Sequence, residues 1–250
     1  MLLLGKTAFI TGCSRGIGEG ILIEFAKNGA DIFAHARKKS KEFEDKCFEL
    51  SEKNNVKIIP VYFDANDSDE LKHAMREIGE KSQNKIDILV NNMGIVSTVK
   101  LFQMTGIQEM KEEFDVNFFA QMQVTQYVSR MMIREKRGSI VNISACAGID
   151  GNTGMLPYVS SKAAMIGATK RLAIELGKYN IRVNSIAPGL TDTDMAAQMS
   201  EQLEKEVMSH LIIKRKAKRE EIADAVTFLA SDKSTYITGQ VLRVDGGMLN

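Results

Sequence analysis

Tyr158 and Lys162 are four residues apart in the stretch Tyr158-Val159-Ser160-Ser161-Lys162. If this stretch opens a helix, the two side chains share one face. A phenol titrates near pKa ~10, and a neighbouring ammonium favours the phenolate. A tyrosine tuned in this way exchanges a proton with a carbonyl or alcohol oxygen near neutral pH. The same pair also occurs on ordinary surface helices, so the rest of the chain has to decide between the two interpretations.

A glycine-rich stretch near the start of the chain has the composition of a phosphate-binding turn. It lies between an apolar run at 7–11 and a helical pattern. Glycine lets the backbone approach a phosphate closely, and a helix N-terminus offers free N–H groups. The spacing Gly-x3-Gly-x-Gly differs from the usual dinucleotide fingerprint, and a plain turn is the alternative. Its place after the first strand of a βαβ pattern favours a dinucleotide site. The binding residues that we predict here are Gly12, Ser14, Arg15, Gly16, Ile17 and Gly18.

The end of the second apolar run indicates which dinucleotide binds. A free ribose 2′-OH usually meets an acidic residue at this point, whereas a 2′-phosphate requires cations. Ala36 and Arg37 stand here, and Arg15 of the glycine-rich stretch is a second cation for the same phosphate. A guanidinium suits a bidentate phosphate contact. We therefore predict NADP(H) rather than NAD.

Polar residues follow the next two apolar runs. Asp64 comes after the third run, where it accepts a hydrogen bond from an adenine amino group or belongs to a helix-capping loop. Asn91-Asn92-Met93-Gly94 follows the fourth run, and asparagine offers both donors and acceptors to a cofactor cleft. The same sequence is also a favourable turn. We expect Asp64, Asn91 and Gly94 to contact the cofactor.

Short apolar runs alternate with longer amphipathic segments along the whole chain. The runs are mostly uninterrupted, as in strands that are covered on both faces. This alternation predicts an α/β fold, namely a single Rossmann-type doubly wound domain over residues 1–250, with a parallel seven-stranded sheet and helices on both faces. The expected strands are 7–11, 31–36, 56–63, 86–91, 139–144, 181–187 and 240–244. The expected helices are 16–28, 39–54, 69–83, 107–135, 158–179, 200–210 and 219–230.

The composition excludes several classes of function. The formal net charge is +1 over 250 residues, so no strong field points to nucleic acid or to an anionic membrane. We find no run of membrane-spanning length and no signal peptide, and we expect a cytoplasmic protein. Three widely spaced cysteines fit a reducing compartment. The three histidines lack metal-ligand spacing, so we predict no metal site and assign His35 to the surface or to packing.

Taken together, these motifs resemble the short-chain dehydrogenase/reductase family, from Gly5 to Gly247. The glycine-rich stretch matches the family's Thr-Gly-x3-Gly-x-Gly, and the Asn-Asn-Met-Gly turn is similar to its Asn-Asn-Ala-Gly. Tyr158-x3-Lys162 matches its catalytic pair, and Pro188-Gly189-x3-Thr193 matches its nicotinamide-side loop. Several motifs in one order are far more specific than any one alone.

The resemblance implies a role for each matching residue. Tyr158 would donate the proton in a reduction, and Lys162 would lower its pKa and bind the nicotinamide ribose. Asn117 matches the asparagine that holds a proton-relay water in this family. The residues expected to flank the nicotinamide and the pyrophosphate are Pro188, Gly189 and Thr193.

One position departs from the family pattern. The family's catalytic serine stands thirteen residues before the tyrosine, and Ala145 occupies that position here. Ser144 is one residue early, and adjacent side chains of a strand point to opposite faces, so Ser144 serves only if the strand end bulges or twists. Thr153 is a further nearby hydroxyl. Losing one such donor typically costs about 10²–10³ in rate.

The resemblance favours an NADPH-dependent enzyme that reduces a ketone to a secondary alcohol, similar to the 3-oxoacyl-[acyl-carrier-protein] reductases. Lys136 and Arg137 offer charge to an acidic carrier, although Tyr179 stands where those reductases tend to carry a second basic residue. The alternatives are a reductase of another keto compound or sugar, and a catalytically impaired NADP-binding protein.

The resemblance also implies a substrate lid and an oligomer. The lid is expected around residues 190–215, where Met195, Met199 and Met208 suit an adaptable apolar wall. We expect a homotetramer or homodimer, with 107–135 and 158–179 at an interface.

Overall fold

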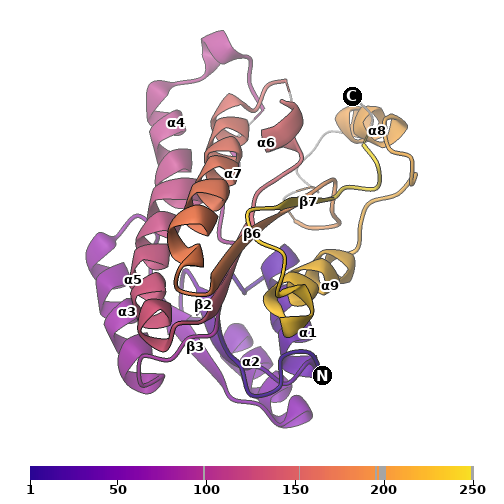
Figure 1. The fold of residues 1–250 in the computed structure, drawn as a ribbon. Helices are drawn as coiled ribbons and strands as arrows, with labels where there is room; N and C mark the ends of the chain where they lie inside the picture. Colours follow the sequence, from indigo (N-terminus) through magenta and orange to yellow (C-terminus); the bar gives the residue numbers. More distant parts are fainter. Residues whose placement is uncertain (98, 152, 195, 197–200, 249–250) are drawn as a thin grey trace.

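One parallel sheet organises the computed structural model, which describes residues 1–97, 99–151, 153–194, 196 and 201–248. Its strands lie in the order β3-β2-β1-β4-β5-β6-β7 (Figure 1). Each expected apolar run forms one of these strands, so the predicted seven-stranded parallel sheet is confirmed. The bounds are β1 Thr7–Ile10, β2 Asp31–Ala36, β3 Ile58–Tyr62, β4 Ile88–Asn91, β5 Gly138–Ile143, β6 Ile181–Pro188 and β7 Val241–Val244.

Helices connect consecutive strands, as parallel pairing requires. Asp67 caps α3, because its carboxylate accepts hydrogen bonds from the N–H groups of Asp69 and Glu70. The α-helices are α1 Gly16–Lys27, α2 Lys41–Asn54, α3 Ser68–Lys81, α4 Ile107–Phe114, α5 Ala120–Glu135, α6 Ala147–Asp150, α7 Leu156–Gly177, α8 Glu201–Ser209 and α9 Arg219–Ala230. Short turns of other helical types are η1 Phe102–Met104, η2 Asp115–Phe119 and η4 Asp232–Ser234.

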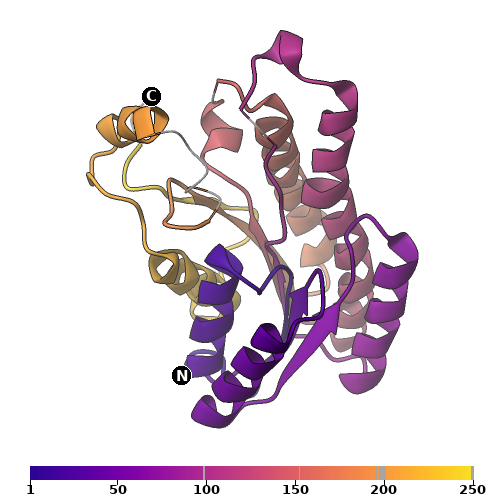
Figure 2. The same cartoon turned by 180° about the vertical axis from the view of Figure 1, so that it is seen from behind.

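The helices cover both faces of the sheet, as Figures 1 and 2 show. Helices α1, α2 and α9 pack on one face, and α3, α5 and α7 pack on the other. The strand β1 illustrates why its apolar run is uninterrupted. Ala8 and Ile10 belong to the first core, and Phe9, which points the other way, belongs to the second.

The strand order reverses between β1 and β4. From β1 the chain builds outward through β2 to β3, and it then returns to place β4 on the other side of β1. Open α/β sheets bind ligands in the crevice at the carboxyl ends of the strands at such a switch point. The glycine-rich turn follows β1 and the Asn-Asn-Met-Gly turn follows β4, so both lie at this crevice.

The segment that we expected as one helix at 107–135 has an irregular turn in its middle. The π-helical turn η2 separates α4 from α5, and it contains Asn117. A π turn inserts one residue into an α-helix and occurs often at functional sites. Periodicity alone does not reveal such a turn, because one extra residue shifts the apolar pattern too little.

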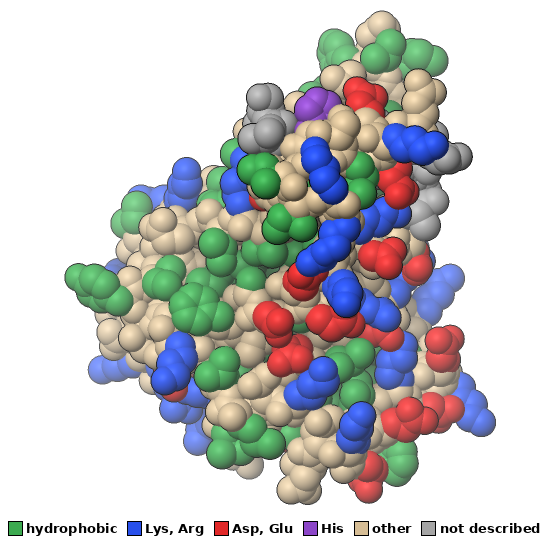
Figure 3. Space-filling model, turned by 90° about the vertical axis from the view of Figure 1, so that its right-hand side faces the viewer, with side chains coloured by type: hydrophobic (Ala, Val, Ile, Leu, Met, Phe, Trp, Pro, Cys, Tyr) green, Lys and Arg blue, Asp and Glu red, His purple; other side chains and the backbone are tan. Residues whose placement is uncertain are grey.

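Charges of both signs are interspersed on the surface seen in Figure 3. This distribution agrees with the formal net charge of +1. Among the described residues, no helix is both long enough and apolar enough to cross a bilayer. No cluster of three or more His, Cys, Asp or Glu side chains suited to a metal ion occurs in that part of the chain.

Candidate active site

Thr11 and Asn92 join the two turns at the switch point. The Thr11 hydroxyl accepts hydrogen bonds from the N–H of Asn92 at 2.9 Å and of Met93 at 3.1 Å. In return, Nδ2 of Asn92 donates to the carbonyls of Thr11 at 2.9 Å and of Gly12 at 3.0 Å. These bonds fix the floor of the crevice.

The glycine-rich turn has no room for side chains at two positions. A Cβ on Gly18 would lie 1.9 Å from the carbonyl oxygen of Gly12, and Gly12 itself has φ +72°. Ser14, Arg15, Gly16 and Ile17 lie between these two glycines. The helix α1 begins at Gly16, and no side chain caps its first N–H groups. A helix N-terminus with free N–H groups suits a phosphate, so the residues present fit a dinucleotide pyrophosphate.

His35 on β2 supports this turn. The sequence indicated only a surface or packing position for it, not these hydrogen bonds. Its Nδ1 accepts the N–H of Gly12 at 3.0 Å, so its Nε2 carries the proton and donates to the carbonyl of Phe63 at 3.0 Å. The ring also stacks on Phe63. Burial lowers the pKa of His35 to about 4, so the neutral ring is the stable form.

Arg37 and Asp64, which we expected to contact separate parts of the cofactor, bind each other. Nε of Arg37 donates to Oδ2 of Asp64 at 2.8 Å. The backbone N–H of Asn66 and this guanidinium together lower the pKa of Asp64. Arg15, whose side chain is exposed, has one guanidinium nitrogen 3.8 Å from a carboxylate oxygen of Asp194. Part of the positive charge expected for a 2′-phosphate is therefore shared with two carboxylates.

Asn91 and Asn92 differ in where their side chains point. Nδ2 of Asn91 donates to Thr125 of α5 and to Asn142 of β5, both at 2.8 Å. The structure therefore places the Asn91 amide in the core, and Asn92 is the residue that contacts the glycine-rich turn. Gly94 lies next to the catalytic candidates, because a Cβ there would be 3.2 Å from Oδ1 of Asn117 and 3.4 Å from Nζ of Lys162.

The long helix α7 carries Tyr158 and Lys162 in its first two turns, with Pro157 at its start. Lys162 is only 3% exposed, and its Nζ donates to the carbonyl of Ile143 at 2.9 Å. The same Nζ lies 5.7 Å from the centroid of the Tyr158 ring. The predicted proximity of the pair is therefore present, at the carboxyl end of β5.

The protonation behaviour of the pair differs from the sequence expectation. We expected Lys162 to lower the pKa of Tyr158, but burial raises it above the ordinary value for a phenol. Burial also lowers the pKa of Lys162 to about 8. The largest cause of both shifts is the same, because the charged form of each group loses hydration.

Asn117 ties η2 to its neighbours. Its Nδ2 donates to the carbonyl of Ile95 at 2.9 Å and to the Ser161 hydroxyl at 3.1 Å, and its Oδ1 accepts the N–H of Ile95 at 2.8 Å. Its main-chain carbonyl accepts a hydrogen bond from Gln121 at 2.8 Å. The side chain thus fixes Ile95 and Ser161 around the Tyr158–Lys162 pair.

Ser144 does not turn its hydroxyl out of the sheet. That hydroxyl donates to the carbonyl of Ile186 at 3.0 Å and accepts from the Ser185 hydroxyl at 2.8 Å. Its two partners belong to β6, and the residue is buried. Ala145 follows with 6% exposure and no polar side-chain atom. Thr153 lies on the exposed segment before α7.

The nicotinamide-side loop reaches the glycine-rich turn. β6 ends at Pro188, and a Cβ on Gly189 would be 2.6 Å from the Cα of Asp245. The side chain of Thr193 would lie 3.5 Å from a Cβ on Gly16, so Thr193 stands at the start of α1. Within the expected lid, α8 is a helix that carries Met208, whereas Met195 and Met199 lie outside the described residues.

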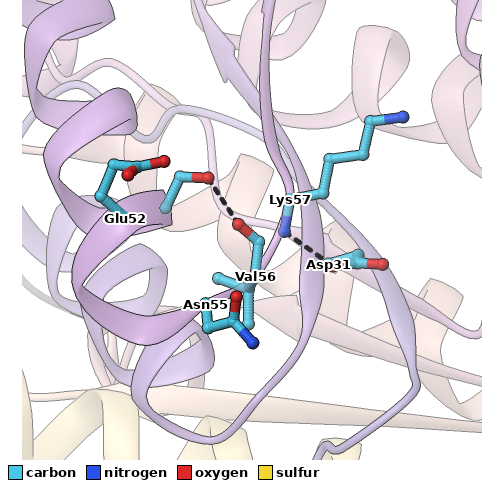
Figure 4. Close-up of a pocket in the computed structure, with 6 residues that line it drawn as sticks. Asp31, Glu52, Asn55, Val56 and Lys57 are labelled. Atoms are coloured by element: carbon cyan, nitrogen blue, oxygen red, sulfur yellow. Dashed lines mark hydrogen bonds between the residues drawn. The ribbon is translucent and has the colours of Figure 1, made fainter.

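A hollow lined by Asp31, Ser51, Glu52, Asn55, Val56 and Lys57 lies away from these motifs (Figure 4). Asp31 begins β2, and Lys57 precedes β3. This hollow is therefore at the amino edge of the sheet, opposite the carboxyl edge that bears Tyr158 and the glycine-rich turn. It is open and polar, and we assign it no role.

A parallel doubly wound sheet with a tight glycine-rich turn at its switch point defines a Rossmann-type protein, a class that binds dinucleotides at this crevice. The family model described as enoyl-(acyl carrier protein) reductase matches residues 12–249. The chain belongs to the short-chain dehydrogenase/reductase family of oxidoreductases.

Three relatives show the extent of the similarity. The 3-oxoacyl-[acyl-carrier-protein] reductase of Thermotoga maritima is 39% identical over 249 residues, which covers 100% of both chains. A 3-oxoacyl-[acyl-carrier protein] reductase of Brucella melitensis, solved with bound NAD, superposes with a TM-score of 0.89 at 29% identity, covering 99% of this chain and 92% of that one. A putative gluconate dehydrogenase from Agrobacterium tumefaciens gives a TM-score of 0.91 at 28% identity, with 98% and 96% coverage.

Proposed function

We propose that the protein reduces the ketone of a 3-oxoacyl thioester to a secondary alcohol with NADPH. The observation that carries this proposal is the placement of Tyr158 and Lys162 beside Gly94 and Asn117, at the same sheet edge as the glycine-rich turn. The full-length similarity to the Thermotoga maritima reductase supports the substrate class.

The nicotinamide cofactor, when bound, supplies the hydride. The chain supplies the proton, because the Tyr158 phenol donates to the oxygen of the carbonyl as negative charge develops there. Lys162, as an ammonium near the Tyr158 ring, stabilises the phenolate that is left behind. Asn117 holds Ile95 and Ser161 so that α7 and the turn after β4 keep their relative positions.

Tyr158→Phe tests the reaction. We expect carbonyl reduction to fall about 10²–10⁴-fold, because the proton donor is lost, while NADPH binding stays unchanged. The measurement is NADPH consumption with acetoacetyl thioesters, with NADPH binding followed by fluorescence. Unchanged turnover would refute the mechanism. A wild-type protein that binds NADPH but reduces no ketone would instead identify a catalytically impaired binding protein.

The preference for NADPH is tested at Arg37. We expect NADPH to bind more tightly than NADH, and Arg37→Ala to weaken NADPH binding about tenfold, since one charge-assisted hydrogen bond to the 2′-phosphate is lost. NADH affinity should stay constant. Lys38→Ala, which removes an exposed charge next to Arg37, is the matched control. Equal affinities of the wild type for NADPH and NADH would contradict this part of the proposal.

A second class of substrate is also a candidate. A sugar or another small keto compound is favoured by the similarity to a putative gluconate dehydrogenase. Lys136 and Arg137, which we expected to meet an acidic carrier, precede β5 at the amino edge of the sheet, and Arg137 pairs with Asp87 at 3.1 Å. Comparing kcat/KM for acyl thioesters and for keto sugars separates the two candidates.

We also propose that the protein is a homotetramer or homodimer in the cytoplasm. Ile107, Phe119 and Ile174 expose large apolar side chains on α4, η2 and α7, which a second copy would cover. The cysteines Cys13, Cys47 and Cys146 are all free and buried, as a reducing compartment favours.

A further inference from the structure

Glu113 is a buried acid in the last turn of α4. Only 1% of the residue is exposed. Its Oε1 accepts hydrogen bonds from both the N–H and the hydroxyl of Ser97, the former at 2.9 Å. Its Oε2 is also buried and has no hydrogen-bond partner among the described residues. A buried carboxyl oxygen without a partner is costly, so such a group needs a physical reason.

The surroundings of Glu113 are the candidate active site. Helix α4 packs against α7, which carries Tyr158 and Lys162, and it runs directly into η2 with Asn117. Ser97 lies three residues after Gly94, whose Cβ position would be 3.4 Å from Nζ of Lys162. Glu113 lies four residues before Asn117, whose side chain binds Ser161, the residue next to Lys162.

The other charged groups around α4 point elsewhere or are already paired. Lys100, on the segment before α4, binds Glu109 at 2.5 Å. The exposed charges on α4 and η2 are Lys111, Glu112 and Asp115. Beyond β5, Cys146 is a further titratable group that acts on Tyr158. Within the described parts of α4, η2 and the segment before them, Glu113 is the buried ionisable residue.

A carboxylate at Glu113 changes the pKa of Lys162 and the pKa of Tyr158 in the same direction. It raises the pKa of Lys162, against the lowering that burial causes. It also raises the pKa of Tyr158, in the same sense as burial. A negative charge stabilises an ammonium and disfavours a phenolate, so both effects favour the protonated forms.

We propose that Glu113 is a positioning residue whose charge keeps Lys162 as an ammonium and Tyr158 as a phenol. The inference rests on the proposed function, because a reduction starts from the protonated pair. It gives Glu113 no contact with substrate and no share in the proton transfer itself. Among the described residues the Oε2 oxygen has no hydrogen-bond partner, and an uncompensated charge acts most strongly on its neighbours in a site from which water is excluded.

The test separates the charge of Glu113 from its shape. Glu113→Gln keeps an oxygen for the two Ser97 donors but removes the charge, and Glu113→Asp keeps the charge but shortens the side chain. Glu112→Gln removes an exposed charge one residue away and is the matched control. For each variant, kcat/KM for ketone reduction is measured as a function of pH.

We expect the alkaline limb of this profile to move about 1 pH unit toward acid in Glu113→Gln, because the midpoints of Lys162 and Tyr158 both fall when the carboxylate is lost. Glu113→Asp and Glu112→Gln should keep the wild-type midpoint, even if Glu113→Asp lowers the plateau. The proposal is overturned if the alkaline limb of the kcat/KM profile does not move in Glu113→Gln, or if it moves only in Glu113→Asp. Glu113 is then a packing residue.

A readout without turnover makes the outcome independent of the reductase assignment. NMR titration of the lysine Cε–Hε signals follows Lys162. Its pKa of about 8 distinguishes its signal from those of exposed lysines. We expect this midpoint to fall in Glu113→Gln and to be unchanged in Glu112→Gln. If no variant reduces a ketone, the proposed function fails, but the titration still decides whether Glu113 acts on Lys162.

Discussion

Ala145 carries only a methyl group, and the residue before it, Ser144, which directly follows β5, carries a hydroxyl. The neighbouring Ser144 hydroxyl is held by the carbonyl of Ile186 and the hydroxyl of Ser185, at 3.0 Å and 2.8 Å. A hydroxyl engaged in this way stabilises the pairing of β5 and β6. In the reaction that we propose, Tyr158 donates to the substrate oxygen, and the Ser144 hydroxyl stays bonded within the sheet.

Ala145→Ser should raise kcat for a good ketone substrate, because a second hydrogen-bond donor would then meet the oxygen as its charge develops. One such donor is typically worth about 10²–10³ in rate, and we expect a gain of at least about tenfold, because the site was not shaped around the extra oxygen. Steady-state kinetics at saturating NADPH measures it.

Ser144→Ala is the matched control for that experiment. It should leave kcat close to the wild-type value and lower the melting temperature, since its hydroxyl bonds lie inside the sheet. A fall in kcat in Ala145→Ser, or a large loss of kcat in Ser144→Ala, would show that another hydroxyl already serves the substrate oxygen.

At the scale of single residues, the sequence predicted the proximity of the motif residues better than it predicted their hydrogen-bond and ion-pair partners. Tyr158, Lys162 and Gly94 come together, because each follows directly from a motif and a strand end. The ion pair of Arg37 with Asp64 joins two different crossovers, so no local pattern reveals it. Glu113 stands in a run of charged residues, where a buried acid looks like its solvated neighbours.

At the scale of elements, the strands were predictable because parallel strands covered on both faces are continuous apolar runs. The helix bounds agree within a few residues where a cap or a proline marks an end, as Asp67 and Pro157 do. The π turn η2 and the short helix α6 were not predicted. Their geometry depends on contacts with α7 rather than on their own composition.

The turn η2 decides how α4 meets the site. Asn117 is buried in it, with hydrogen bonds to Ile95 and Ser161. The irregular backbone there lets α4 and α5 present different faces to α7 and to the sheet. The positions of Asn117 and Glu113 relative to Tyr158 are thus consequences of one inserted residue.

At the scale of the whole molecule, His35 links folding stability to pH. Its pKa is about 4 in the folded chain, whereas the ordinary value is 6.5. Since the folded pKa is lowered, the unfolded chain binds more protons between these values. The contribution of neutral His35 to the free energy of unfolding is complete above pH 6.5. It is lost as the pH falls toward 4, by about 3 kcal/mol in total.

His35→Gln should remove this dependence. The variant should be less stable than the wild type at pH 8, because the glutamine amide does not reproduce both ring hydrogen bonds. Between pH 6.5 and 4, however, the wild type should lose about 1.4 kcal/mol per pH unit more than the variant does. Urea unfolding at a series of pH values measures this difference. Parallel stability curves for the two proteins would rule His35 out as the source.

The bonds between Thr11 and Asn92 also determine when, during translation, the cofactor crevice can form. A ribosome releases the glycine-rich turn early, but the residues that close it are 81 positions further along the chain. Tyr158 emerges later still, and Gly189 obtains its partner, the carbonyl of Val244, only when the last strand is made. The nascent chain therefore acquires its cofactor crevice in stages, and the complete site exists only after nearly every residue has been translated.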